Sequence, residues 1–137
     1  MIKDERLVFA DVLDLTKAYA CPELVSLVRT FVCERSGAIT VTDAVKFAKP
    51  CAFEDPLLTV GSFAPAQALL GAAGWKTTVT NGQGSLALTL KASDRTAELF
   101  TETIENPGKP TPKVLGVRLP SVKEATVTVR FAPASPV

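Results

Sequence analysis

Hydrophobic and polar residues alternate along several short segments of the chain. In the segment Ile39–Phe47, the apolar residues Ile39, Val41, Val45 and Phe47 share one face, and threonines and a lysine share the other. A period of two residues predicts a half-buried β-strand. The segments Ser85–Lys91 and Glu124–Phe131 show the same alternation, so the pattern favours a β-fold.

Glycine and proline interrupt the chain at short intervals between these segments, which is typical of all-β domains. The pattern predicts an all-β fold, an antiparallel two-sheet β-sandwich of about nine strands. The predicted strands are Leu7–Leu13, Val25–Cys33, Ile39–Phe47, Pro56–Ser62, Trp75–Thr80, Ser85–Lys91, Thr96–Ile104, Val114–Leu119 and Glu124–Phe131.

Two turns predict hairpins. The apolar residues of 24–32 fit a helical face as well as a strand covered on both sides. We favour the strand, because Glu34–Gly37 then forms a turn that pairs Val25–Cys33 with Ile39–Phe47. Asn81–Gly84 predicts a second hairpin between Trp75–Thr80 and Ser85–Lys91.

The length of 137 residues predicts a single β-sandwich domain, 1–137, with a Pro-rich tail at 132–137. Ala66–Ala73 is interpreted as a helical turn or a loop, and Asn106–Pro112 as a stiff connector. The segment Met1–Lys3 leads into a strand almost at once and has no signal-peptide pattern. Such a start suits an excision point from a longer protein.

Composition excludes several kinds of site. The chain has no histidine, which excludes Ser-His-Asp and Cys-His catalysis and histidine zinc sites within it. A net charge of +1 argues against nucleic-acid binding. The apolar stretch Ala64–Trp75 is too short and broken to span a membrane. We expect no cofactor, no metal and no catalytic residue in this chain.

Cysteine and aspartate spacing also gives structural interpretations. Cys21, Cys33 and Cys51 form no C-x-x-C pair, and we interpret them as small buried apolar residues, with one disulfide as the alternative. Asp11 and Asp14 would point to opposite faces of a strand, and Asp14 suits an Asx-type turn.

Two aromatic residues are candidate binding residues. Trp75, the only tryptophan, could stack on a sugar ring, although it is more typical of a core or sheet-rim position. Tyr19, the only tyrosine, could bind a ligand or pack its ring with its hydroxyl bonded. Seven basic residues could also line an anion-binding groove, although the sequence does not place them together: Arg29, Arg35, Lys46, Lys49, Lys76, Lys91 and Arg95.

The order of three segments resembles a known family. Asp14–Tyr19 matches a D-x-T-x-A-Y pattern and is followed by Leu27–Val32 and Gly37–Val45. This order is similar to the C-terminal β-sandwich region of heparinase II/III-like polysaccharide lyases. The resemblance covers Leu7–Phe63 by these segments and the remainder by strand pattern only.

The resemblance implies a role for the chain. Such bacterial lyases join a helical toroid to a β-sandwich and cleave uronic-acid glycans by β-elimination, with tyrosines and histidines of the helical domain and its cleft as catalytic residues. None of these residues has a counterpart here, and the role of Tyr19 is not defined by the resemblance. We therefore expect a non-catalytic accessory domain that packs against a helical catalytic domain and lines the cleft of an acidic polysaccharide. A periplasmic or secreted location would follow. The alternative is a free-standing carbohydrate-binding or protein-interaction module.

Overall fold

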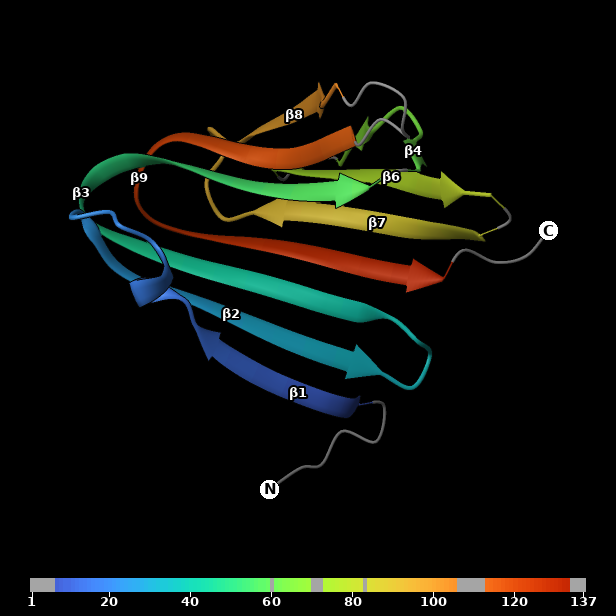
Figure 1. Ribbon diagram of the computed structural model, residues 1–137, viewed down its shortest axis with the longest axis horizontal. Helices are drawn as coiled ribbons and strands as arrows, with labels where there is room; N and C mark the ends of the chain where they lie inside the picture. The colour runs from blue at the N-terminus through green and yellow to red at the C-terminus, as the bar shows by residue number, and fades with distance from the viewer. Residues whose placement is uncertain (1–6, 60, 70–72, 83, 106–112, 134–137) are drawn as a thin grey trace.

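The computed structural model describes residues 7–59, 61–69, 73–82, 84–105 and 113–133. Within them the chain is almost entirely β-structure, which confirms the all-β prediction (Figure 1). One 3-10 helix, η1, spans Thr16–Ala18. The strands are β1 Leu7–Asp14, β2 Leu24–Glu34, β3 Ile39–Thr59, β4 Ser62–Phe63, β5 Gln67–Ala68, β6 Gly74–Asn81, β7 Gly84–Ala92, β8 Glu98–Thr103 and β9 Lys113–Pro133.

All nine strands of the described ranges belong to one antiparallel sheet, in which the order is β1-β2-β3-β9-β7-β6-β4. The strand β5 pairs with β6 at its margin, and β8 pairs with β9. The two strands β3 and β9 pair along almost their whole length and are each 21 residues long. Both curve together at the left of Figure 1.

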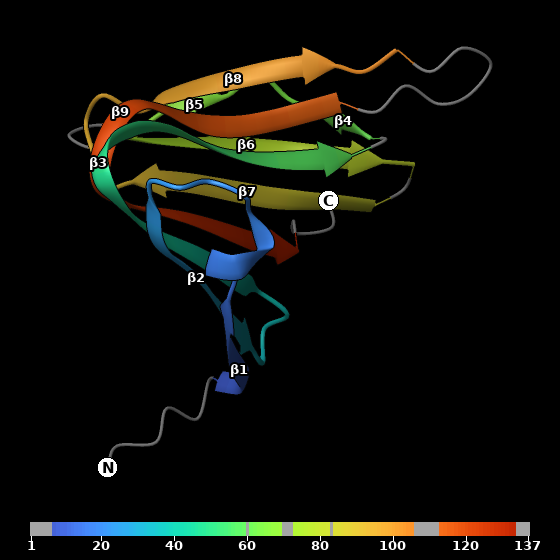
Figure 2. The ribbon, with the colours of Figure 1, turned by 60° about the vertical axis from the view of Figure 1, so that its left-hand side comes forward.

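The curve divides the sheet into two arms. Pairing between β3 and β9 shifts register between Lys46 and Phe53, where the strands turn. One arm contains the first half of β3, the second half of β9 and the strands β1, β2, β7 and β6. The other contains the second half of β3, the first half of β9 and β8. Figure 2 shows β8 at the top of the folded sheet and β1 at the opposite end.

The core lies between the two arms. Residues of β7 and of both halves of β9 form one buried cluster, because alternate side chains of each arm point inward. This arrangement is compatible with a two-sheet sandwich, although the strand pairing links the layers into one sheet. The largest fully buried side chains are Leu90, Leu115, Leu119, Val45, Val117 and Val127.

Two pairs of predicted strands are parts of longer strands. Ile39–Phe47 continues through the bend into the segment predicted to start at Pro56, and Val114–Leu119 continues into Glu124–Phe131. The predicted separation into four strands is therefore wrong. Pro56 is tolerated because the second half of β3 pairs only with β9 among the described residues, which leaves its other edge open.

Both predicted hairpins are confirmed. In the first, β2 pairs with β3 from Leu24↔Phe47 to Cys33↔Ile39, so the strand interpretation of 24–32 is also confirmed. Gly37 has φ of 90° in its turn, a conformation that glycine adopts without strain. In the second hairpin, β6 and β7 pair as far as Asn81↔Gly84.

The remaining predicted segments have mixed outcomes. Part of Ala66–Ala73 forms the short strand β5 instead of a helical turn, while 70–72 lie outside the described residues. The connector at 106–112 also lies outside them. In the predicted tail, Ala132 and Pro133 pair with β7, and 134–137 are not described. No helix in the described ranges has the length and hydropathy needed to cross a bilayer.

Candidate functional site

A groove of about 470 Å³ lies between β2 and the second half of β3. Its floor is formed by the inward face of β2 and of the first half of β3, and the segment 52–56 of β3 forms its wall. Tyr19, from the loop after η1, contributes to one end. The polar side chains that line the groove are Tyr19, Arg29, Glu54 and Asp55.

Arg29 and Asp43 form the central ion pair beneath the groove. They lie opposite each other on β2 and β3. The Arg29 Nε atom donates to Oδ1 of Asp43, and Nη2 donates to Oδ2, both at 2.7 Å. Asp43 is only 2% exposed, so this two-pronged contact supplies the hydrogen bonds that a buried carboxylate needs. The hydrogen bond with Asp43 raises the pKa of Arg29.

Asp55 adds a second buried carboxyl group to this pair. It is 6% exposed, and its Oδ1 atom lies 3.8 Å from Nη2 of Arg29. Burial, followed by the hydrogen bond with Asp43 and the charge of Asp43, raises the pKa of Asp55 to about 8. Burial also acts to raise the pKa of Asp43, but hydrogen bonds from Arg29 and Asp55 outweigh it and lower that pKa. At neutral pH, Asp55 therefore carries the proton that the two carboxyl groups share.

The loop that carries Tyr19 is fixed by the residues of the D-x-T-x-A-Y segment. Oγ1 of Thr16 donates to Oδ1 of Asp14 at 2.6 Å, and the Thr16 amide donates to the same oxygen at 3.0 Å. These two bonds lower the pKa of Asp14. Oγ1 of Thr16 also accepts from the amide of Leu27 on β2, which ties the loop to the groove floor. The predicted Asx-type turn at Asp14 is thereby confirmed.

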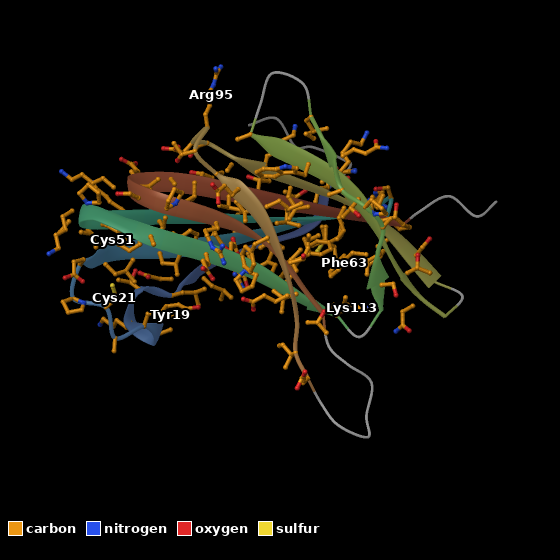
Figure 3. The ribbon with its side chains drawn as sticks, turned by 90° about the horizontal axis from the view of Figure 1, so that it is seen from above. Tyr19, Cys21, Cys51, Phe63, Arg95 and Lys113 are labelled. Carbon is orange, nitrogen blue, oxygen red and sulfur yellow. The ribbon has the colours of Figure 1, made fainter. Side chains whose placement is uncertain are left out.

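Tyr19 is 56% exposed although it lines the groove, so one part of its ring is available to a ligand. Figure 3 shows Tyr19 and Cys21 at the same end of the molecule, opposite Phe63 and Lys113. Tyr19 thus lines the same groove as the guanidinium of Arg29.

A second groove of about 460 Å³ continues beyond the first. The two share Arg29, Asp55 and Pro56, so the ion pair lies at their junction. The lining of the second groove is mainly apolar. Its other residues are Phe31, Gly37, Ile39, Val41, Leu57, Leu86, Val129 and Phe131.

The inward face of β1 and β2 extends beyond both grooves without a covering strand among the described residues. Phe9 and Leu13 belong to this face, because Leu13 lies opposite Arg29 in the pairing of β1 with β2. Phe9 is 54% exposed and Leu13 is 42% exposed. We call the set Phe9, Leu13, Phe31 and Ile39 the apolar strip.

Trp75 lies elsewhere. It belongs to β6, opposite Leu90, and packs against the buried cluster. It does not line the groove that contains Tyr19. The structure therefore separates the two candidate aromatic residues and gives Trp75 a packing role.

The basic residues proposed as an anion groove are also dispersed. Of the seven, only Arg29 lines the groove. Lys49 pairs with Glu23, and Arg95 points away from the sheet in Figure 3. The three cysteines are free thiols and half-buried, not fully buried as predicted.

Sequence reasoning missed Asp43 and Asp55 as a pair. Asp43 alternates with Val41 and Val45 and therefore shares their face of the strand. A charged residue on an apolar face is a signal that the sequence alone contains. The position of Asp55 beside it depends on the bend of β3. Within the described residues, no group of three or more His, Cys, Asp or Glu side chains could hold a metal ion.

Comparison with protein-family models and with curated proteins finds no match to the chain.

Proposed function

We propose that this chain is a non-catalytic β-domain of a heparinase II/III-like polysaccharide lyase that binds glycan in the groove at Tyr19 and packs against a helical catalytic domain. The observation that carries the proposal is the exposed Tyr19 ring in one groove with Arg29 and Asp55. The resemblance of the segments from Asp14 to Val45 supplies the family.

The lining of the groove suits a sugar. A sugar ring offers an apolar face to an aromatic side chain and hydroxyl groups to planar polar side chains. Asp43 already balances the charge of Arg29, while Asp55 at neutral pH is uncharged, with its proton directed to Asp43 and its other oxygen able to accept a hydrogen bond. The cluster therefore favours hydrogen bonds to hydroxyl groups over simple attraction of an anion, and an acidic polysaccharide would bind through its ring and hydroxyls here.

The apolar strip supports the second part of the proposal. Exposed apolar surface beside a polar groove is typical of an interface with another domain. A domain seated on Phe9 and Leu13 would stand beside the groove and convert it into a cleft between the two. The glycan would then lie with Tyr19 and Arg29 on one wall, and the catalytic residues would come from the partner domain.

The glycan-binding part can be tested by following backbone amide signals in nuclear magnetic resonance (NMR) spectra during titration with uronic-acid oligosaccharides. We expect shifts at Tyr19, at Arg29 and around Asp55, and a loss of affinity of at least tenfold in Tyr19→Ala. Trp75→Phe is the matched aromatic control and should bind as the wild type does. Shifts centred on Trp75, or unchanged affinity in Tyr19→Ala, would contradict the assignment of the groove.

The domain part requires a separate measurement. An antibody against this chain, used on extracts of the source cells, should detect a polypeptide far larger than 14.5 kDa. A band at the size of the chain would contradict the accessory-domain proposal and favour the free-standing binding module. The two measurements are independent, because glycan binding is compatible with either size.

A further inference from the structure

The two halves of β3 each contribute one buried carboxyl group to the cluster around Arg29. Asp43 lies in the half that pairs with β2, and Asp55 lies in the half that, within the described part of the chain, pairs with β9 alone. Their hydrogen bond crosses the bend between these halves. The contact therefore joins two segments of one strand that have no backbone pairing with each other.

The charges around this contact do not balance when both acids are ionised. From β2, the single guanidinium of Arg29 contacts Asp43 directly and lies 3.8 Å from Asp55. From the loop after η1, Tyr19 supplies no positive charge. Arg118 of β9 pairs with the exposed carboxylate of Glu54, so its positive charge compensates that group and neither Asp43 nor Asp55. A proton held between the two acids removes the excess negative charge.

We propose that Asp43, Asp55 and Arg29 form a proton-dependent latch that holds the two halves of β3 together and sets the width of the groove. In the closed form, protonated Asp55 donates to Asp43, and Arg29 neutralises Asp43. When Asp55 loses its proton, two buried carboxylates face one guanidinium. Their repulsion and the cost of burying an unpaired charge favour separation of the halves.

A pair of aromatic rings crosses the same bend and reports on its closure. Phe47 lies in the first half of β3 and Phe53 near the start of the second half. Their ring centroids are 6.5 Å apart, with the planes at 63°. Protons of two rings at this separation give a nuclear Overhauser effect, which falls steeply as the rings move apart.

The pH range of the latch follows from Asp55. Its pKa is raised from 3.8 to about 8, so the folded state holds this proton over a range in which the unfolded chain has lost it. The stabilising contribution is fully present below the ordinary pKa and is lost as the pH rises through the folded pKa. We therefore expect the latch to be closed at pH 6.5 and open above pH 8.5.

The test measures the nuclear Overhauser effect between Phe47 and Phe53 from pH 6 to 9.5 in the ligand-free protein. We expect the wild type to lose at least half of this signal with a midpoint near pH 8. The variant Asp55→Asn should retain it throughout, because an amide can donate to Asp43 and carries no charge. Asp94→Asn, which alters an exposed carboxyl group in a turn with Thr96, should titrate as the wild type does.

Two results would overturn the latch: a signal that does not change with pH in the wild type, or the same change in Asp55→Asn. If Asp55→Asn fails to fold, carbon-detected titration of Asp55 in the wild type replaces it. The midpoint for the carboxyl group must then coincide with the midpoint for the ring contact, and a difference of more than one pH unit rejects the latch.

The latch itself does not depend on the proposed function. Only the further step, in which the width of the groove changes glycan binding, rests on that proposed function. Because the ring contact is measured without a glycan, a latch without glycan binding would reject only the proposed function. Glycan binding with a pH-independent ring contact would reject only the latch.

Discussion

Gly116 of β9 lies opposite Phe100 of β8, and no side chain fits between them. A Cβ atom at position 116 would lie 2.7 Å from two ring carbons of Phe100 and 2.8 Å from the carbonyl oxygen of Asp55. The guanidinium of Arg118 lies 4.6 Å from the centroid of the same ring. The glycine thus allows the Phe100 ring to lie close against β9.

We expect Gly116→Ala to destabilise the protein by about 1–3 kcal/mol, because both backbone and ring would have to shift. Urea denaturation followed by circular dichroism measures the change. Gly84→Ala is the control, since among the described residues the methyl group it would add approaches only the carbonyl oxygen of Asn81, at 3.8 Å. If Gly116→Ala lowered the free energy of unfolding by no more than Gly84→Ala does, β8 and β9 would have to move apart at little cost, and the prediction would be wrong.

Replacement of Arg29 by leucine should cost about 3 kcal/mol of stability, because it leaves the buried carboxylate of Asp43 without its partner. Arg29→Lys should recover only part of the lost stability, since an ammonium group cannot reproduce the bidentate hydrogen bonds of the guanidinium to Asp43. The comparison is Arg130→Leu. That residue pairs with Glu34 on the surface, and its loss should cost no more than about 1 kcal/mol. Thermal or urea unfolding measures both variants. Equal losses of stability in Arg29→Leu and Arg130→Leu would contradict the claim that the buried ion pair of Arg29 contributes more than a surface pair.

Thr16→Val should loosen the Tyr19 loop while leaving the sheet intact. The variant loses the side-chain bond to Asp14 and the acceptor for the Leu27 amide. We expect the pKa of Asp14 to rise toward its ordinary value. Glycan affinity should fall severalfold, even though Thr16 itself does not line the groove, because the loop that carries Tyr19 is less fixed. Carbon-detected titration and the oligosaccharide titration measure these effects.

Thr16→Ser is the matched control for that experiment, because it keeps the hydroxyl group. It should retain both the lowered pKa of Asp14 and the affinity. The stabilising effect of a lowered carboxyl pKa is present above the unfolded value and disappears as the pH falls, so any stability difference between the two variants should narrow in acid.

All three cysteines should react as thiols. The described structure contains them unpaired and half-buried. We expect three equivalents of thiol in the unfolded protein without a reductant, measured by a colorimetric thiol assay. One equivalent would instead indicate a disulfide, and the mass would then increase by two hydrogens on reduction.

The sequence pattern predicted the local pairing well because both sides of a hairpin are close along the chain. The alternation in Ile39–Phe47 and the glycine at position 37 were enough to place β2 against β3 with the observed partners. The long strands were not predicted, because Pro50 and Pro120 look like strand boundaries. In the structure, the pairing of β3 with β9 shifts register around these positions instead of ending.

The candidate site was predicted only in part for the same reason. Tyr19 and Arg29 were singled out by residue type, and they share the groove. Asp55 could not be joined to Asp43 without knowledge of the bend, since alternation defines faces only within one regular strand. Trp75 was a candidate as the only tryptophan, but its place opposite Leu90 is fixed by the second hairpin.

The position of β9 has a consequence for how the protein acquires its fold. This strand comes last among the described elements, yet it pairs with β3, β7 and β8. During synthesis, the hairpins β2–β3 and β6–β7 emerge from the ribosome before the strand that connects them. They expose apolar faces until β9 arrives, so folding is completed late and depends on contacts distant in sequence. A nascent chain arrested before Lys113 would lack the strand that joins β3 to β7, and with it the core that these strands share.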